Sequence, residues 1–116
     1  MKFFSWLESK KDPKEFERKT VAKTDEIKSE DYKAWYNQGI SLSKLEKYDE
    51  AIKSYDKAIE IKPDYYVAWS NRGNALSKLK KYRKSVKSYD KAIEIKPDYY
   101  VAKDNQEIVR KKLTKS

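Results

Sequence analysis

The chain has 116 residues, of which 28 are Lys or Arg and 19 are Asp or Glu, so its formal net charge is +9, and it contains neither Cys nor His. This length fits one small domain. Without Cys or His the chain excludes thiol chemistry, zinc sites of the Cys/His type and imidazole-based catalytic triads. We therefore expect no metal and no cofactor.

The first 30 residues differ in composition from the rest, because all three Phe lie at or before Phe16 and all ten Tyr lie within Tyr32–Tyr100. The opening apolar run is interrupted at Glu8 and is too short for a signal peptide or a membrane span, so we expect a cytoplasmic protein. Asp12–Glu15 has the pattern of a helix start, with the helix beginning at Pro13. This segment either covers the helices that follow or is disordered, and the sequence leaves both open. A third alternative is that its apolar residues dock on a partner or a membrane surface; these are Phe3, Phe4, Trp6 and Leu7.

From Tyr32 onward the sequence repeats with a period of 34 residues, and residues 32–65 match residues 66–99 at 24 of 34 positions. Lys53–Ala68 recurs unchanged as Lys87–Ala102, so the similarity continues into a third, partial unit. We therefore divide the chain into four parts. They are an N-terminal segment (1–30), repeat 1 (31–65), repeat 2 (66–99) and a C-terminal capping helix with its tail (100–116).

Apolar residues in each unit recur at the spacing of two amphipathic helices. The pattern predicts helices at 32–45, 49–61, 66–79, 83–95 and 99–113. Asp64 and Asp98 are expected to cap the helices that follow them, and Pro63 and Pro97 to end the helices before them.

The only two glycines, Gly39 and Gly73, occupy the same position in their units, in the middle of a predicted helix. Glycine there costs about 1 kcal/mol relative to alanine, so something must compensate. We expect the rings of Tyr55 and Tyr89 to approach the glycine backbones closely.

The third unit keeps small or apolar residues on its inner face but places Lys103, Glu107 and Arg110 where repeat 2 has Trp69, Gly73 and Leu76. A solenoid cannot leave its last apolar face in water. This charged face therefore predicts a capping helix.

The 34-residue period, two helices per unit and a set of motif residues together resemble the tetratricopeptide repeat (TPR) family. The motif residues are Trp35, Gly39, Ala51, Tyr55, Ala58 and Pro63, followed by Trp69, Gly73, Ser85, Tyr89, Ala92 and Pro97. The resemblance implies an all-α solenoid of antiparallel helix pairs, wound as a right-handed superhelix, with both tryptophans in the core. It also implies a non-catalytic module that binds a peptide or a partner protein in its concave groove.

The resemblance implies that the first helix of each unit lines this groove. The corresponding positions hold Lys33, Tyr36, Asn37, Ile40, Lys44, Val67, Ser70, Asn71, Asn74, Lys78, Val101, Asp104, Asn105 and Ile108. Among them Asn37, Asn71 and Asn105 are spaced by 34. An amide offers a donor and an acceptor to a peptide backbone, although these asparagines can equally be ordinary repeat sequence.

One TPR subclass grips the C-terminal carboxylate of heat-shock chaperones with two Lys, two Asn and an Arg. At the corresponding positions this chain matches only with Asn71 and has Tyr36, Ile40, Val101 and Asn105 at the others. We therefore expect that it is not a carboxylate clamp.

Charge is distributed unevenly, because residues 32–65 carry no net charge and residues 66–99 carry +6. The difference comes from three positions that are acidic in repeat 1 and basic in repeat 2. The acids are Glu46, Asp49 and Glu50, and the bases are Lys80, Arg83 and Lys84. Together with residues of the third unit the sequence predicts a basic edge, formed by Lys80, Lys81, Arg83, Lys84, Arg110, Lys111 and Lys112.

Several uses of these surfaces stay open. The basic edge would assist an acidic protein partner, or it would bind nucleic acid or an anionic membrane electrostatically. Exposed solenoid ends would also allow self-association. An enzyme is not expected, because the carboxylates lie beside lysines on helix surfaces and there is no glycine-rich phosphate loop.

Overall fold

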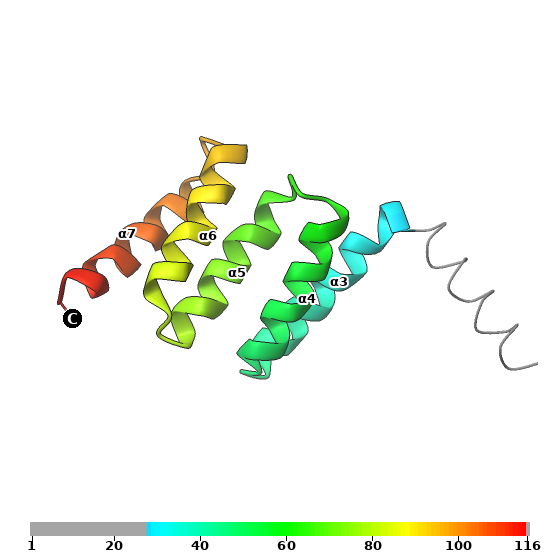
Figure 1. The fold of residues 1–116 in the computed structure, drawn as a ribbon, viewed down its shortest axis with the longest axis horizontal. Coiled ribbons are helices and arrows are strands. Elements are labelled where there is room, and N and C mark those ends of the chain that lie inside the picture. Colours follow the sequence, from blue (N-terminus) through cyan, green and yellow to red (C-terminus); the bar gives the residue numbers. More distant parts are fainter. Residues whose placement is uncertain (1–27, 116) are drawn as a thin grey trace, which may run out of the picture.

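The computed structural model describes residues 28–115, which form five helices and no strand. The helices are α3 (Lys28–Lys44), α4 (Tyr48–Ile61), α5 (Tyr66–Lys78), α6 (Tyr82–Ile95) and α7 (Tyr100–Lys115) (Figure 1). The predicted all-α class is confirmed. The helix expected to begin at Pro13 lies outside the described residues.

The observed helix bounds agree closely with those predicted from periodicity, except that α3 begins earlier, at Lys28. The cap predicted at Asp64 is wrong. The residue at the N-cap of α5 is Tyr65, which makes no side-chain cap hydrogen bond. The Asp64 carboxylate instead lies 3.1 Å from Nζ of Lys62, because the chain turns back on itself between α4 and α5.

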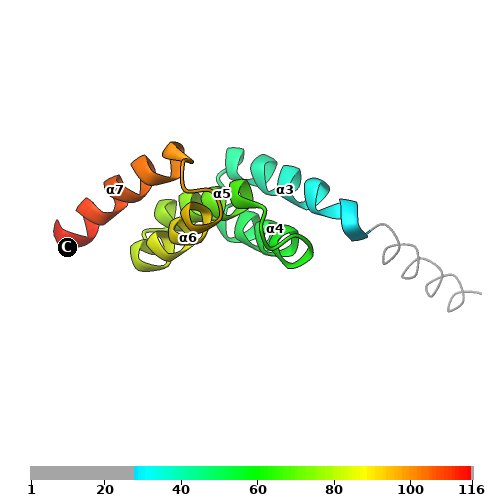
Figure 2. The same ribbon diagram turned by 90° about the horizontal axis from the view of Figure 1, so that it is seen from above.

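The helices form two layers. Figure 2 shows α3, α5 and α7 on one side and α4 and α6 on the other. Each helix packs mainly against the next one along the chain, whereas α3 meets α5, and α5 meets α7, only sparsely. This is the arrangement of a helical solenoid, and the sparse contacts between first helices leave hollows along their shared face.

The glycine prediction is confirmed. Tyr55 and Tyr89 are each only 1% exposed. A Cβ atom built on Gly39 would lie 2.5 Å from Cε1 of Tyr55, and one on Gly73 would lie 2.8 Å from Cε1 of Tyr89. Each tyrosine ring therefore lies directly across the backbone of the helix that precedes it.

The junction between successive units is built the same way twice. The Arg72 Nε atom donates to Oδ1 of Asp56 at 2.6 Å, which ties α5 to α4. One period later, Gln106 Nε2 donates to Oδ1 of Asp90 at 2.7 Å and ties α7 to α6. The repeat in sequence is thus a repeat in contacts.

The capping character of α7 is visible in its exposure. Its inward residues Ala102 and Val109 are buried, whereas Lys103, Glu107 and Arg110 are exposed. The face of α7 that carries these three residues is therefore polar.

The two tryptophans of the repeats, Trp35 and Trp69, are both partly buried. Trp69 is half-buried against the cluster formed by α6 and α7, and its indole Nε1 donates to the Pro63 carbonyl at 2.8 Å. Trp35 is also half-buried. No helix within residues 28–115 has the length and apolarity needed to cross a membrane.

Candidate peptide-binding groove

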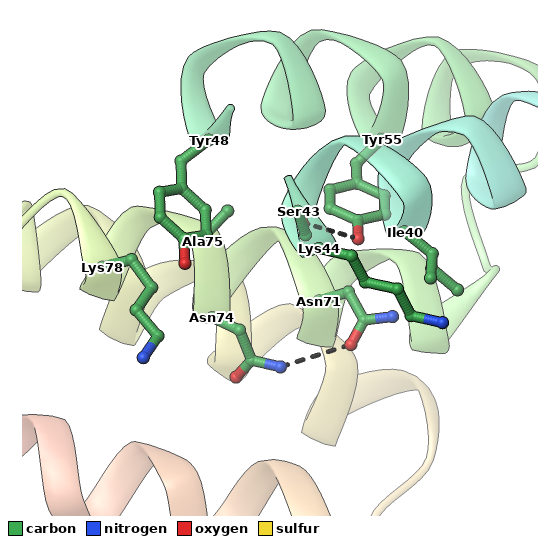
Figure 3. A pocket seen from close by; sticks show the side chains of 9 residues that line it. All are labelled: Ile40, Ser43, Lys44, Tyr48, Tyr55, Asn71, Asn74, Ala75 and Lys78. Atoms are coloured by element: carbon green, nitrogen blue, oxygen red, sulfur yellow. Dashed lines mark hydrogen bonds between the residues drawn. The ribbon is translucent and has the colours of Figure 1, made fainter. Parts of the chain in front are cut away.

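A hollow of about 300 Å³ opens between α3 and α5, with the side chains of two α4 tyrosines at its wall (Figure 3). It is lined by Ile40, Ser43, Lys44, Tyr48, Tyr55, Asn71, Asn74, Ala75 and Lys78. Five of these residues were predicted for the groove. We call it the first groove hollow.

A second groove hollow of about 330 Å³ lies between α5 and α7. It is lined by Asn74, Ser77, Lys78, Tyr89, Asn105, Ile108 and Val109. Each of these residues stands 34 positions after a residue of the first groove hollow. Both hollows include Asn74 and Lys78, so they are neighbours on the face formed by the first helices, and we call them together the candidate groove.

The tyrosine rings that cross Gly39 and Gly73 also bring their hydroxyls to the groove. Tyr55 Oη lies 3.3 Å from Oγ of Ser43, and Tyr89 Oη donates to Oδ1 of Asn74. Burial raises the pKa of Tyr55, and it raises the pKa of Tyr89 to about 12. Both hydroxyls are therefore neutral hydrogen-bonding groups at physiological pH.

A chain of amide hydrogen bonds runs along the groove floor. Asn105 Nδ2 donates to Oδ1 of Asn74 at 3.3 Å, and Asn74 Nδ2 donates to Oδ1 of Asn71 at 3.2 Å. Asn71 Nδ2 in turn donates to Oη of Tyr36 at 3.0 Å. The network links α3, α5 and α7 and fixes the orientation of each amide, whereas Asn37 is exposed and takes no part in it.

The groove is positively charged. Lys44 and Lys78 are exposed at its rim, and no Asp or Glu lines either groove hollow. Neither amine makes an ion pair with the described residues. Both therefore remain available to a carboxylate from outside.

The tetratricopeptide repeat profile matches residues 32–65 and 66–99. The chain belongs to the tetratricopeptide repeat family. Members of this family are generally non-catalytic interaction modules. A comparison with curated proteins found no match.

Several solved structures share the fold. The second TPR of Spaghetti (RPAP3), bound to the HSP90 peptide SRMEEVD, is similar with a TM-score of 0.73 and 25% identity over 75% of this chain and 81% of that one. The Sgt2 TPR domain from Aspergillus fumigatus gives a TM-score of 0.71 and 22% identity over 74% of this chain and 57% of that one. MamA gives 0.70 and 22%, with 72% of this chain and 48% of that one covered.

Against this TPR fold, the predicted groove positions divide into three groups. Residues in the groove hollows are Ile40, Lys44, Asn71, Asn74, Lys78, Asn105 and Ile108. Residues of the first helices that line neither hollow are Lys33, Tyr36, Asn37, Val67 and Val101, together with the exposed Asp104.

Ser70 forms the third group, because its prediction as a groove residue is wrong. It is 1% exposed, and its hydroxyl has no hydrogen-bond partner within the described part of the chain. Tyr36, which has the same register in repeat 1, is long enough to reach Asn71 with its hydroxyl. A serine side chain at this position does not reach the surface.

For Tyr55 and Tyr89, the two tyrosines at the groove of this TPR, the sequence predicts only a packing role. Tyr55 and Tyr89 do pack against glycine, but each ring is long enough to pass the helix and present its hydroxyl on the far side. In both repeats a mid-helix glycine in the first helix is matched by a tyrosine in the second helix, and this recurring pair is the sequence signal for the role.

The predicted basic edge is formed in part. Lys80, Lys81, Arg83 and Lys84 line one hollow with Tyr82 and Leu113. In contrast, Arg110 Nη2 lies 3.8 Å from Oδ1 of Asp90. The remaining two predicted residues lie on α7, where Lys111 is exposed and Lys112 Nζ is 5.8 Å from the ring centre of Tyr82.

Proposed function

We propose that this chain is a protein-interaction module that binds an acidic, extended peptide of a partner protein in the groove across α3, α5 and α7. The observation that carries the proposal is the pair of equivalent hollows, which share Asn74 and Lys78 and hold lysines without any carboxylate. An extended peptide can fill both hollows at once, because they lie side by side on one face.

The lining supplies the three kinds of contact that peptide recognition needs. Ile40 and the 53%-exposed Ile108 offer apolar surface. The oriented amides offer hydrogen bonds to a peptide backbone, since each keeps bonding capacity beyond the network. Lys44 and Lys78 offer charge-assisted hydrogen bonds to Asp or Glu side chains.

The relatives support peptide binding in general. The Spaghetti domain was solved with the HSP90 peptide SRMEEVD, an acidic sequence. This chain differs at the positions that grip a terminal carboxylate, where it has Tyr36, Ile40, Val101 and Asn105. We therefore propose internal acidic segments, and not a chain terminus, as the ligand.

A selection from a random peptide library on the full chain tests this function. The groove variant carries Lys44→Glu and Lys78→Glu, and the matched control carries Lys53→Glu and Lys87→Glu. The control has the same charge change and spacing, but its lysines are exposed on the second helices α4 and α6.

We expect acidic peptides to be enriched. Charge reversal at the groove should weaken their binding by about tenfold or more, since two favourable contacts become repulsive. The control should bind like the wild type. Equal loss in both variants, or enrichment of basic peptides, would contradict the proposal.

An electrostatic binder of nucleic acid or anionic membrane is the alternative that the basic edge favours. Four exposed cations gather in one hollow there. Phosphate binding of this kind weakens steeply as salt rises. We place this function second, because Glu46, Asp49 and Glu50 lie on the same edge and would repel a polyphosphate that follows it.

A further inference from the structure

Two hollows lie along the edge where first helices turn into second helices, the lower edge in Figure 1. One, of about 240 Å³, is lined by Glu46, Lys47, Tyr48, Asp49, Glu50 and Leu79. The other, of about 510 Å³, is lined by Lys80, Lys81, Tyr82, Arg83, Lys84 and Leu113. Every residue of the second stands 34 positions after its counterpart in the first. We call them the acidic hollow and the basic hollow.

The charges of both hollows lack ion-pair partners among residues 28–115. Elsewhere charged side chains pair, as Lys62 does with Asp64 at 3.1 Å. None of the three acids of the acidic hollow, and none of the four bases of the basic hollow, forms an ion pair with the described residues. All seven are exposed. Two opposite charge clusters therefore face solvent one repeat apart.

Local helix stability does not explain the basic cluster. Arg83 and Lys84 lie in the first turn of α6, where the helix dipole is positive and disfavours cations. Lys81 at the N-cap makes no side-chain cap hydrogen bond. An anionic group from outside would relieve this concentration of positive charge.

We propose that a second copy of this chain supplies that group, by pairing edge to edge about a twofold axis between the two hollows. Such an axis places the acidic hollow of one copy against the basic hollow of the other, and it does so twice. Isologous contacts of this kind are self-complementary and close at two subunits. The edge is therefore complementary in charge to the same edge of a second copy.

The composition of the hollows suits such a contact. Tyr48 and Leu79 are apolar parts of the lining of the acidic hollow, and Tyr82 and Leu113 are the same for the basic hollow. Charged residues make up the rest of each lining. Small interfaces combine apolar and charged residues in this way.

Net charge sets the conditions in which pairing is expected. The chain carries +9, so two copies repel each other over long distances. At about 0.1 M salt the Debye length is about 10 Å, which screens distant charges but leaves contacts across the interface effective. At about 1 M salt it is about 3 Å, and we expect the pairs to separate.

Sedimentation velocity on the full chain and four variants tests the pairing. The all-basic variant carries Glu46→Lys, Asp49→Arg and Glu50→Lys. The all-acidic variant carries Lys80→Glu, Arg83→Asp and Lys84→Glu. The swapped variant carries all six changes. The control carries Lys53→Glu, Lys57→Glu and Lys87→Glu, which match the charge change of the all-acidic variant on exposed surface of α4 and α6.

We expect the wild type, the swapped variant and the control to dimerise at moderate salt. The all-basic and all-acidic variants alone should each dimerise at least about tenfold more weakly, because like charges then meet at both contacts. An equimolar mixture of these two variants should form heterodimers. Circular dichroism verifies that every variant remains helical.

Three results would overturn the proposal. They are a wild type that stays monomeric up to about 1 mM at moderate salt, half-variants that dimerise as well as the wild type, and a swapped variant that does not regain dimerisation. Salt-sensitive binding of a nucleic acid oligomer or an anionic vesicle to a monomeric wild type would assign the basic hollow to the alternative function instead. Peptide binding in the groove does not depend on any of these outcomes.

Discussion

Replacement of Gly73 by alanine sets two effects of opposite sign against each other. Alanine favours the middle of a helix by about 1 kcal/mol over glycine. The new Cβ, however, would lie 2.8 Å from Cε1 of Tyr89 and 3.0 Å from both Cδ1 and Cζ, where ordinary contacts are 3.4–4 Å. The tyrosine is 1% exposed, so its ring is packed on nearly all sides. Overpacking of this kind costs about 1–3 kcal/mol.

We therefore expect Gly73→Ala to destabilise the wild-type chain by up to about 2 kcal/mol. In a Tyr89→Leu background the sign should reverse, because leucine lacks the Cε1 and Cζ atoms and leaves the helix preference of alanine, worth about 1 kcal/mol. Denaturant unfolding of the four proteins of this double-mutant cycle measures the coupling. Equal effects of Gly73→Ala in both backgrounds would refute the reasoning.

Three further changes test the packing and electrostatics. Ser70→Ala should stabilise the fold by about 1 kcal/mol in thermal unfolding, because it removes a buried hydroxyl that has no hydrogen-bond partner among the described residues. A loss of stability would show that this hydroxyl is hydrogen-bonded. Burial raises the pKa of Tyr89 from 10.0 to about 12, so the neutral tyrosine contributes its full stability below pH 10.0, and this contribution is lost as the pH rises to about 12. Tyr89→Phe should therefore make the free energy of unfolding fall less steeply with pH in this range. An unchanged slope would contradict this. Arg72→Met should lower the free energy of unfolding by about 1 kcal/mol, and by less at high salt, because the ion pair of Arg72 with Asp56 is partly exposed. A loss of stability that does not depend on salt would assign the effect to packing.

The helical architecture was predictable because each unit repeats the spacing of its apolar residues. A 34-residue period predicts two helices per unit, and the mid-helix Gly39 predicts the close approach of the Tyr55 ring, which the structure confirms. What the sequence predicts for one unit also holds for the next, because the contacts repeat: the contact of Arg72 with Asp56 recurs one period later between Gln106 and Asp90. Those predictions concern packing, which a repeated sequence encodes directly.

The groove was less predictable, because its chemistry depends on positions that differ between units. Asn74 connects Asn71 with Asn105, yet repeat 1 has Ile40 at the equivalent position, so a ladder at constant spacing does not form. Ser70 is buried because its side chain is short, and the register of a residue in the repeat does not tell how far its side chain reaches. The cap predicted at Asp64 failed for a similar reason, since an aspartate before a helix can also pair with a nearby lysine.

The network along the groove floor has a consequence for binding. Its amides are held in one orientation by bonds to one another and to Tyr36, so a peptide meets hydrogen-bonding groups that are already placed. Preorganisation lowers the entropic cost of association. A peptide contact to Asn74 is therefore expected to depend on its neighbours, and Asn71→Ala should weaken binding even of peptides that do not touch Asn71.

NMR mapping of amide shifts, when a peptide selected on the wild type is added to the full chain, tests whether the face shared by α3, α5 and α7 binds an extended acidic peptide as proposed. We expect the largest changes on the first helices around both groove hollows, at Ile40, Lys44, Asn74, Lys78 and Ile108. Changes concentrated on the outer surfaces of α4 and α6, or at the basic hollow, would contradict it.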